Sequence, residues 1–360
     1  MQQTFLELLR LGAGLKDPAL VRGRLMPEEK LWDNLMQMAA EQGLTSVAMD
    51  GMDCLLDGQE MLLVSPINKW IASTLRVEGK CAAQWETACQ WASRAAKQGI
   101  RTYVLKGAVE AECYPRPGHR RSSDFDCFLC EETGGGEAWE RGNAMVQAAG
   151  YVVQRNHYKN STWFLPDLMV ENHRFLTPFR GNHRLKALER LLQKMIRSGE
   201  GATRFEGTDL YRPPVMVSAI FLIEHSYTHF LHEGLAWRYV MDWLMFSSRH
   251  RDEIDWDTLN GWIDVFGFRR FYDAFRQMAR LLTGQITEAD LSASDRRMLE
   301  DIWAPLALHK NKEGLRKKLS IMRNTLRASW KYRLFTPLSM PHALWIQLKG
   351  AFFMWNPTLD

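Results

Sequence analysis

The hydrophobic pattern changes its period twice along the chain. At the N-terminal end apolar residues recur every three or four positions, which indicates amphipathic helices, and the longest predicted helix runs from about Asn68 to Gln98. Short apolar runs between turn residues follow and predict strands, and helical spacing then returns. The four predicted segments are residues 1–98, 99–180, 181–300 and 301–360. We expect a helical N-terminal region, an α/β core, a helical lobe and a basic, aromatic C-terminal helical segment.

The second segment mixes strands with helices. Its first strand is predicted around Tyr103 to Leu105, and a short helix follows from Ala108 to Cys113. Three later strands are predicted at Tyr151 to Asn156, Ser161 to Leu165 and Leu168 to His173. This order predicts an α+β fold in which a small mixed sheet with helices is flanked by N- and C-terminal helical regions.

Two carboxylates stand out in the strand between these elements. Asp124 and Asp126 alternate with apolar Phe125 and Cys127. Residues i and i+2 of a strand point to the same face, so both carboxylates leave one face together. Two negative charges at such a short distance repel each other unless a cation lies between them. A hard divalent ion with oxygen ligands, Mg²⁺ first, is the simplest such cation.

The residues before this pair supply a turn and positive charge. Lys106-Gly107 ends the first strand, and Gly107 lets the backbone turn sharply or approach a ligand closely. The N–H groups that open the helix at Ala108 can face a phosphate. Arg120 and Arg121 place cations just before the carboxylates, where a triphosphate needs them.

These motifs together resemble a known family. They are Leu105-Lys106-Gly107, Tyr114-Pro115, Arg121-x-x-Asp124-x-Asp126 and Glu171-x-His173. This set is similar to the uncharacterised nucleotidyltransferase family of the polymerase-β superfold, which has a glycine turn and helix before an Asp-x-Asp strand and a third carboxylate on a neighbouring strand. By position Gly107 matches the turn glycine and Glu171 the third carboxylate. Ala108 departs from the usual Ser or Gly, so a hydroxyl that would hold a phosphate is missing there.

The resemblance implies a Mg²⁺-dependent nucleotidyltransferase, which transfers a nucleoside monophosphate from an NTP to a hydroxyl acceptor and releases pyrophosphate. Two Mg²⁺ ions and an NTP donor, ATP first, are the expected cofactors. The expected catalytic and metal-binding residues are Asp124, Asp126 and Glu171. The expected nucleotide-binding residues are Lys106, Gly107, Arg120, Arg121, Ser123, His173 and Arg238. The acceptor stays open among a small molecule, a protein and an RNA.

Histidines recur on the helix predicted after Pro213-Pro214. His225 and His229 lie one turn apart and His232 follows at i+7, a spacing that can hold zinc. Three interpretations stay open: structural or cleft-lining histidines, direct substrate contacts, and a metal site. In the resembled family a histidine-bearing helix precedes an Arg-x-x-x-Asp pair. Here that pair is Arg238 and Asp242, which we expect to interact across one turn.

A further histidine, His173, shares a strand face with Glu171. It either binds the nucleotide or orients Glu171, or it is a hydrogen-bonded histidine of the sheet. Glu171 itself follows apolar Val170 in a strand suited to burial, where a lone carboxylate is costly unless it is paired or metal-bound.

Composition indicates the class of protein and the cellular compartment to expect. The 360 residues are 46% hydrophobic and 24% charged, which is typical of a folded globular chain. The six cysteines show no disulfide framework, and neither a signal peptide nor an apolar stretch of about 18 residues stands out. We therefore expect a cytoplasmic protein without a transmembrane segment.

Positive charge gathers late in the chain, although the net charge is only +4. From Lys310 to Arg333 basic residues dominate, with Trp330 and Tyr332 among them. This run is either a solvated helix face or a surface for nucleic acid or anionic lipid. Two alternatives to the enzyme therefore remain: a catalytically inactive nucleotidyltransferase fold that binds a nucleotide or a partner, and a nucleic-acid-binding regulator.

Overall fold

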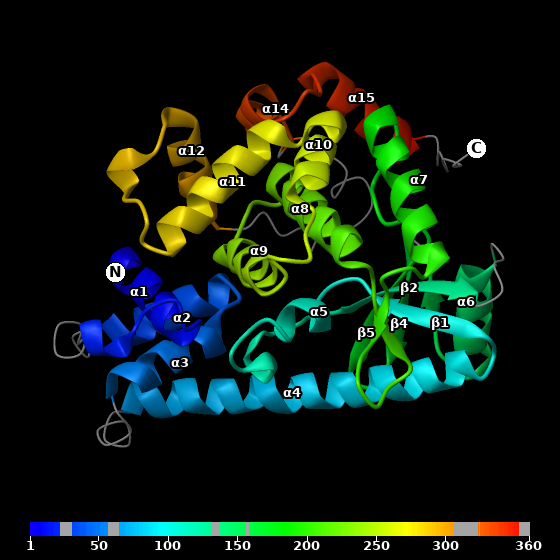
Figure 1. Ribbon diagram of the computed structural model, residues 1–360, viewed down its shortest axis with the longest axis horizontal. Coiled ribbons are helices and arrows are strands. Elements are labelled where there is room, and N and C mark those ends of the chain that lie inside the picture. Colours follow the sequence, from blue (N-terminus) through cyan, green and yellow to red (C-terminus); the bar gives the residue numbers. More distant parts are fainter. Residues whose placement is uncertain are drawn as a thin grey trace.

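A mixed sheet of seven strands lies under a lobe of helices and beside one very long helix (Figure 1). The computed structural model describes residues 1–21, 31–56, 65–131, 137–155, 158–305, 323 and 325–352. The strand order is β3-β4-β5-β2-β1-β7-β6. The strands are β1 (Ile100–Val104), β2 (Phe125–Glu131), β3 (Val153–Gln154), β4 (Asn160–Leu165), β5 (Leu168–His173), β6 (Thr203–Arg204) and β7 (Leu210–Arg212). The α+β class predicted from the sequence is confirmed.

The N-terminal region is helical, as its spacing predicts. Its elements are α1 (Gln2–Gly12), the 3-10 turn η1 (Pro18–Leu20), α2 (Trp32–Glu41), α3 (Thr45–Leu56) and α4 (Ser65–Ala96). The 32 residues of α4 extend over about 48 Å. This helix therefore reaches from the N-terminal helices to the sheet, where Trp91 packs edge to face on Trp163 of β4 with ring centroids 4.7 Å apart.

The two faces of the sheet meet different helices. Gly142 of α6 (Ala138–Ala148) packs against Leu129 of β2, so α4 and α6 cover one face. On the opposite face the guanidinium of Arg197, from α7 (His183–Ser198), lies 5.5 Å from the ring centre of Phe128. Successive residues of a strand point to opposite faces, so Phe125 and Cys127 face α4 and α6, while Asp126 faces the α7 side.

The helical lobe begins where the sequence predicts it. Pro213 and Pro214 precede α8 (Val215–His232), and Gly199 in the left-handed region ends α7. The remaining elements are α9 (Trp237–Arg249), α10 (Trp256–Phe266), α11 (Arg269–Leu282), the 3-10 turn η5 (Glu288–Asp290), α12 (Ala293–Trp303), α14 (Ser329–Phe335) and α15 (Met340–Phe352). None of the described helices combines the length and the apolar character needed to cross a membrane.

Two strands are missing from the sequence prediction. β6 and β7 lie in the segment that was expected to be helical, and β7 pairs in parallel with β1, Thr102 opposite Leu210. Both strands are only two or three residues long, so they carry no readable alternation. Their pairing is decided by contact with a strand about a hundred residues earlier, which local sequence does not encode.

Candidate active site

Three polar side chains of neighbouring strands meet on the sheet face that looks toward α7 and α8. β2 and β5 run in parallel, with Asp126 opposite Glu171 and Phe128 opposite His173. Asp126, Glu171 and His173 each offer a ligand atom, and these atoms lie within 4.8 Å of one another. Within the described chain this is the one such cluster of three His, Cys, Asp or Glu residues. The sequence predicted this meeting of Asp126 and Glu171 on adjacent strands.

His173 holds the two carboxylates in place. Its Nε2 donates to Asp126 Oδ1 at 2.9 Å and lies 3.6 Å from Glu171 Oε2, while Nδ1 lies 3.2 Å from the carbonyl oxygen of Phe175. Both ring nitrogens thus face acceptors, which requires a proton on each. Burial alone would lower the pKa of His173, but the hydrogen bonds to Asp126 and Glu171 raise it above its usual value. His173 therefore joins the side chain of Asp126 to the backbone of Phe175 and lies beside that of Glu171.

Lys106 supplies the cation between the paired aspartates. Its Nζ contacts Asp126 Oδ2 and lies 3.2 Å from Asp124 Oδ1. Burial would raise the pKa of Asp126, but Lys106 and His173 outweigh it and hold that pKa well below its usual range. The repulsion between Asp124 and Asp126 is thus relieved within the protein, so the acid pair by itself does not require a metal.

The glycine turn lies directly beside this ion pair. Gly107 has φ +89° and precedes α5 (Ala108–Ala111), whose Glu110 side chain accepts a hydrogen bond from the Gly107 N–H. A Cβ at Gly107 would lie 3.0 Å from Ser122 Oγ. The hydroxyl that Ala108 lacks is therefore present beside the turn on Ser122, whose Oγ donates to the Asp124 carbonyl oxygen at 2.7 Å.

Comparison with known proteins agrees with this geometry. The chain matches the family described as "Uncharacterised nucleotidyltransferase" over residues 28–284, well over half of its length. It belongs to this nucleotidyltransferase family. Searches of curated proteins and of solved structures give no match. The family relationship suggested by the glycine turn, the Asp-x-Asp run and Glu171 is thereby confirmed.

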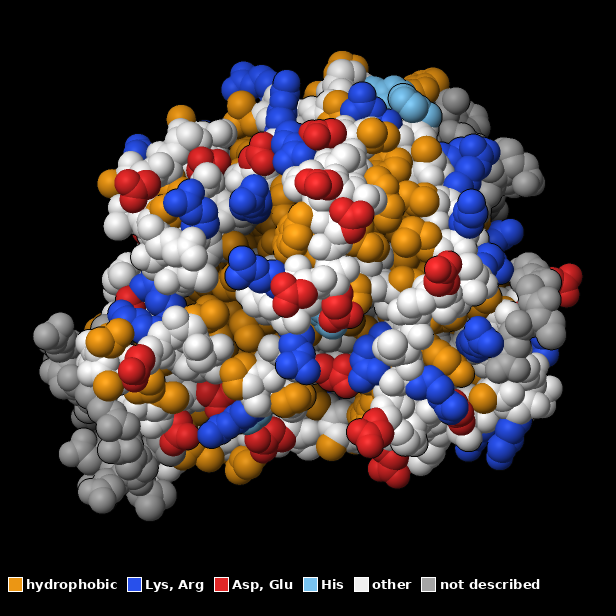
Figure 2. Space-filling model, viewed as in Figure 1, with side chains coloured by type: hydrophobic (Ala, Val, Ile, Leu, Met, Phe, Trp, Pro, Cys, Tyr) orange, Lys and Arg blue, Asp and Glu red, His pale blue; other side chains and the backbone are white. Residues whose placement is uncertain are grey.

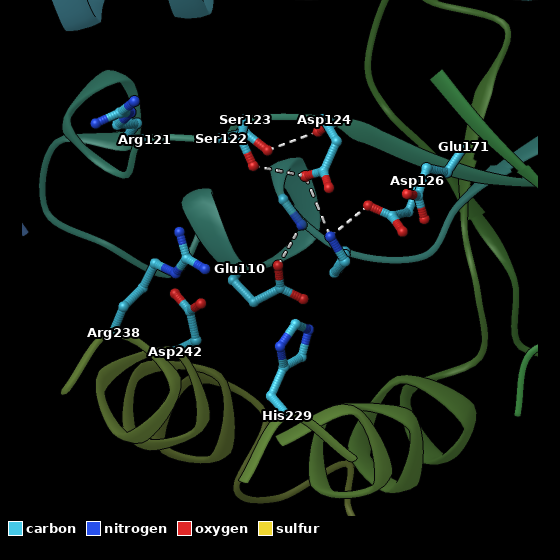
Figure 3. A network of polar contacts seen from close by, with 12 residues as sticks. Glu110, Arg121, Ser122, Ser123, Asp124, Asp126, Glu171, His229, Arg238 and Asp242 are labelled. Atoms are coloured by element: carbon cyan, nitrogen blue, oxygen red, sulfur yellow. Dashed lines mark hydrogen bonds and ion pairs between the residues drawn. The ribbon is translucent and has the colours of Figure 1, made fainter. Parts of the chain in front are cut away.

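Other predicted nucleotide-binding residues of this family member lie on the loop before β2. Ser123 is exposed, and its Oγ donates to Asp124 Oδ1 at 3.1 Å. Arg121 is exposed as well, and its side chain lies apart from the carboxylates (Figure 3). Arg120 differs, because it is buried and donates to Asp242 from Nε at 3.1 Å and from Nη2 at 2.7 Å. The guanidinium of Arg120 is thus bound within the protein.

The expected pair of Arg238 and Asp242 is wrong. Asp242 is bound to Arg120 and accepts a further hydrogen bond from the Tyr114 hydroxyl at 2.8 Å. The guanidinium of Arg238 instead lies over Tyr239, 5.0 Å from the ring centre. Arg120, from the loop before β2, competes better for the Asp242 carboxylate than Arg238 on the same helix, because the planar guanidinium of Arg120 binds both carboxylate oxygens.

A buried carboxylate that sequence reasoning missed completes this network. Glu110 has no exposed surface, and its Oε2 lies 3.5 Å from Arg120 Nη2. Burial raises the pKa of Glu110 to about 7. The positive charge of Arg120 acts against this rise, and the negative charge of Asp242 adds to it. The sequence did contain a signal for Glu110: it lies three residues after Gly107, the position at which a glutamate side chain caps the start of a helix. Glu110 and Arg120 thus tie the glycine turn to α9.

The histidines of α8 line the same region without forming a metal site of their own among the described residues. His229 points toward Glu110 from across the site (Figure 3), and its Nδ1 lies 3.0 Å from Glu233. His225 packs edge to face on His229 at 4.5 Å, and burial lowers the pKa of His225 well below its usual value. His232 is exposed at the end of α8. Of the three interpretations, this arrangement favours structural and cleft-lining histidines.

The basic run from Lys310 to Arg333 lies largely outside the described residues. Within its described part, Arg327 and Arg333 are exposed, but Lys331 is buried. Lys331 Nζ lies 2.6 Å from Asp301 Oδ1 and donates to the Phe230 carbonyl oxygen at 2.6 Å. Lys331 therefore belongs to the packing of the lobe, and its assignment to a solvated or nucleic-acid-binding face is wrong.

Proposed function

We propose that this chain transfers a nucleoside monophosphate from an NTP to a hydroxyl acceptor and releases pyrophosphate. The observation that carries the proposal is the cluster of Asp126, Glu171 and His173 on adjacent parallel strands beside a glycine turn, in a chain of the nucleotidyltransferase family. This arrangement agrees with the polymerase-β superfold. We accordingly assign residues 99–180 as the catalytic core and residues 181–300 as the lobe that closes over it.

The donor set fits a hard divalent cation. Asp124, Asp126 and Glu171 offer carboxylate oxygens, which Mg²⁺ prefers, and Glu171 keeps 31% of its side chain exposed to approach from outside. We assign Mg²⁺ to these three carboxylates, and His173 to the orientation of Asp126. When bound, Mg²⁺ supplies positive charge that polarises the phosphoryl oxygens and stabilises the charge of the transition state.

The side chains of the protein have separate roles in this proposal. The acceptor oxygen attacks the α-phosphorus, the bond from that phosphorus to the pyrophosphate oxygen breaks, and pyrophosphate leaves. Glu171 takes the proton of the acceptor hydroxyl as an ionised carboxylate: burial would raise its pKa, but the hydrogen bond to His173 and the charge of Lys106 outweigh burial and lower it. Lys106 neutralises phosphate charge, and Gly107, Arg121, Ser123 and Arg238 are proposed to contact the nucleotide.

Calorimetric titration of the four NTPs with Mg²⁺ tests this function. The wild type is compared with the double variant Asp124→Asn/Asp126→Asn, and with Asp167→Asn, which changes an exposed turn aspartate away from the site. We expect Mg²⁺-dependent binding of at least one NTP with a Kd of roughly 1 μM to 1 mM, lost in the double variant and kept in Asp167→Asn. Absence of binding by every NTP to the wild type would contradict the proposal.

One observation favours a second function, nucleotide binding without turnover. Lys106 contacts both Asp124 and Asp126, so a cation already occupies the space between the two carboxylates. In a catalytically inactive relative this arrangement would persist with nucleotide bound. Pyrophosphate release in the presence of an acceptor separates the two functions, since only the transferase produces it.

A further inference from the structure

The backbone of the glycine turn has a conformation that proteins rarely populate. Gly107 has φ +89° and ψ −84°, close to the values of the strained, uncommon form of the γ-turn. Backbone of this kind persists only where the surrounding structure holds it, and it is concentrated at sites that bind ligands. Two hydrogen bonds to α5 hold this turn. The Gly107 N–H donates to Glu110, and the Ala111 N–H donates to the Gly107 carbonyl oxygen at 3.0 Å.

A buried network keeps Glu110 in place. The Nη2 atom of Arg120 lies 3.5 Å from Glu110 Oε2, and the guanidinium also donates to both carboxylate oxygens of Asp242 on α9. The Tyr114 hydroxyl donates to the same carboxylate at 2.8 Å. All four residues are at most 8% exposed. Because little water competes for these contacts, the network holds the Glu110 carboxyl group at the turn.

The conformation of the turn decides where Lys106 lies. Lys106 directly precedes Gly107, and its ammonium group contacts Asp126 and lies 3.2 Å from Asp124 Oδ1. A different backbone conformation at Gly107 would redirect the peptide that joins it to Lys106, and the lysine side chain with it. In the proposed function Lys106 neutralises the phosphates of the donor. Its placement therefore matters, since a shift of about 1 Å can lower a rate about 100-fold.

We propose that Glu110 is a positioning residue for the donor phosphates: its carboxyl group, anchored by Arg120, accepts the Gly107 N–H and thereby keeps Lys106 in place. The inference rests on the proposed function and adds to it a residue that does not touch the nucleotide. Arg120, which the sequence assigns to the nucleotide itself, acts through Glu110 instead. Because Glu110 takes the Gly107 N–H, the turn serves the donor through Lys106 and through the missing Cβ of Gly107.

Two substitutions of Glu110 test this role by calorimetry, with Mg²⁺ and the NTP that the wild type binds most tightly. Leucine removes the acceptor for the Gly107 N–H, whereas glutamine keeps an oxygen for it. We expect the Kd to rise about tenfold in Glu110→Leu and to stay within about twofold of the wild type in Glu110→Gln. An unchanged Kd in Glu110→Leu would overturn the proposal, and so would an equal rise in both variants.

Glu189 provides a matched control for lost stability. It is also fully buried, and its carboxylate accepts the N–H groups of Leu176 at 3.0 Å and of Thr177 at 2.7 Å. Glu189→Leu therefore removes the same kind of contact from the segment after β5. It should leave the Kd unchanged at a temperature at which circular dichroism shows every variant to be folded. A tenfold rise in Glu189→Leu would assign the effect to destabilisation and overturn the specific role of Glu110.

A double-mutant cycle tests how Arg120 acts. Arg120→Lys keeps the positive charge but loses the planar fork that reaches two carboxylates. We expect this variant to raise the Kd about threefold by itself and to cause no further rise in Glu110→Leu, because both changes act through one contact. Additive effects would show that Arg120 contacts the nucleotide directly and would overturn its proposed anchoring role.

Nuclear magnetic resonance follows the bond between Glu110 and Gly107 without any ligand. The sequence holds two Lys–Gly pairs, Lys106–Gly107 and Lys349–Gly350, so carbonyl-¹³C lysine with ¹⁵N-glycine selects two amide signals. Gly350→Ala removes one and so identifies the other. We expect the Gly107 signal to shift as Glu110 ionises at a pKa of about 7, and to lose this shift in Glu110→Gln.

Other charged or titratable groups also act on Glu110. They are Lys106, Cys113, Tyr114, Arg120, His229 and Asp242. A Gly107 shift that persists in Glu110→Gln would come from one of these groups and would overturn the hold of Glu110 on the turn. Glutamine has nearly the same shape as glutamate, so this comparison does not depend on a strongly destabilised variant.

The outcomes separate this inference from the function on which it rests. If the wild type binds an NTP and Glu110→Leu binds it equally well, the positioning role alone fails. If the wild type binds no NTP, both the proposed function and the positioning role fail. A tenfold weaker Kd in Glu110→Leu, with normal binding by Glu110→Gln and Glu189→Leu, supports both.

Discussion

Lys106 and Asp126 form a buried ion pair at one end of the interior strands β1 and β2, with 14% and 2% of their side chains exposed. The pair joins the end of β1 to β2, and Asp124 shares the same ammonium group at 3.2 Å. Figure 2 shows acidic and basic side chains close together at the middle of the face below the helical lobe. Pairing of opposite charges inside the protein is thus the electrostatic basis of this site, and it leads to the first prediction.

Lys106→Met should destabilise the protein, because Asp124 and Asp126 lose their shared cation. Removal of one partner from a buried pair costs about 3–5 kcal/mol of unfolding free energy. We expect Mg²⁺ to restore part of this loss, since it can replace the ammonium charge between the carboxylates. Urea unfolding with and without Mg²⁺ measures both effects. Lys69→Met, an exposed lysine of α4, is the control, and an equal response to Mg²⁺ in both variants would contradict the metal assignment.

Asp126→Asn should abolish turnover while the fold is kept. The asparagine has nearly the same shape, so packing against His173 persists, but its charge is lost from the reaction centre. Loss of a group that stabilises transition-state charge typically lowers kcat by about 100-fold or more. Pyrophosphate release is the measurement, with circular dichroism to check the fold. Normal turnover in this variant would refute its role in catalysis.

Because of Glu110, the free energy of unfolding should change with pH in the range below pH 7. Its folded pKa of about 7 lies above the ordinary value of 4.5, so its contribution is fully present below about pH 4.5 and is lost as pH rises to about 7. At 1.36 kcal/mol per pKa unit the full loss amounts to about 3 kcal/mol. In Glu110→Gln this loss should be missing. The difference in unfolding free energy between the two proteins, measured from pH 4 to 8, tests it; a constant difference would contradict the shifted pKa.

His119 should contribute to the free energy of unfolding over a higher pH range than Glu110 does. Its Nδ1 lies 2.7 Å from Asp50 and its Nε2 contacts Glu78, and the hydrogen bond to Asp50, against burial, raises its pKa above 6.5. Its contribution is therefore present below about pH 6.5 and is lost as pH rises through the raised pKa. His119→Asn should lose more stability at pH 6 than at pH 9. Proton NMR titration of the imidazole gives the pKa directly, and a value below 6.5 would contradict this account.

Gly107→Ala should be more costly than Gly99→Ala. Both glycines have positive φ, +89° and +70°, but a Cβ at Gly107 would meet Ser122 Oγ at 3.0 Å, whereas nothing lies within 4 Å at Gly99. We expect about 1 kcal/mol of destabilisation at Gly99 and about 2–3 kcal/mol at Gly107. Thermal unfolding of the two variants makes the comparison. Equal losses would show that contact with Ser122 has no energetic weight.

Local sequence predicted the strands that carry Asp126 and Glu171 because the signals of these strands are short-ranged. Alternation around Asp124 and Asp126, the turn at Gly107 and the apolar strand around Glu171 are each readable within a few residues. The partners of the arginines were not readable in this way. Arg238 and Asp242 are neighbours on one helix, yet Asp242 binds Arg120, more than a hundred residues earlier in the chain.

The sequence by itself thus determined the α+β class, the family and the carboxylates, since periodicity, turn chemistry and motif spacing are properties of the chain alone. Only the tertiary structure decided which charges neutralise each other. It placed Lys106 between the aspartates and buried Glu110 and Lys331. Pairing and desolvation depend on distances between segments far apart in sequence, and folding alone fixes those distances.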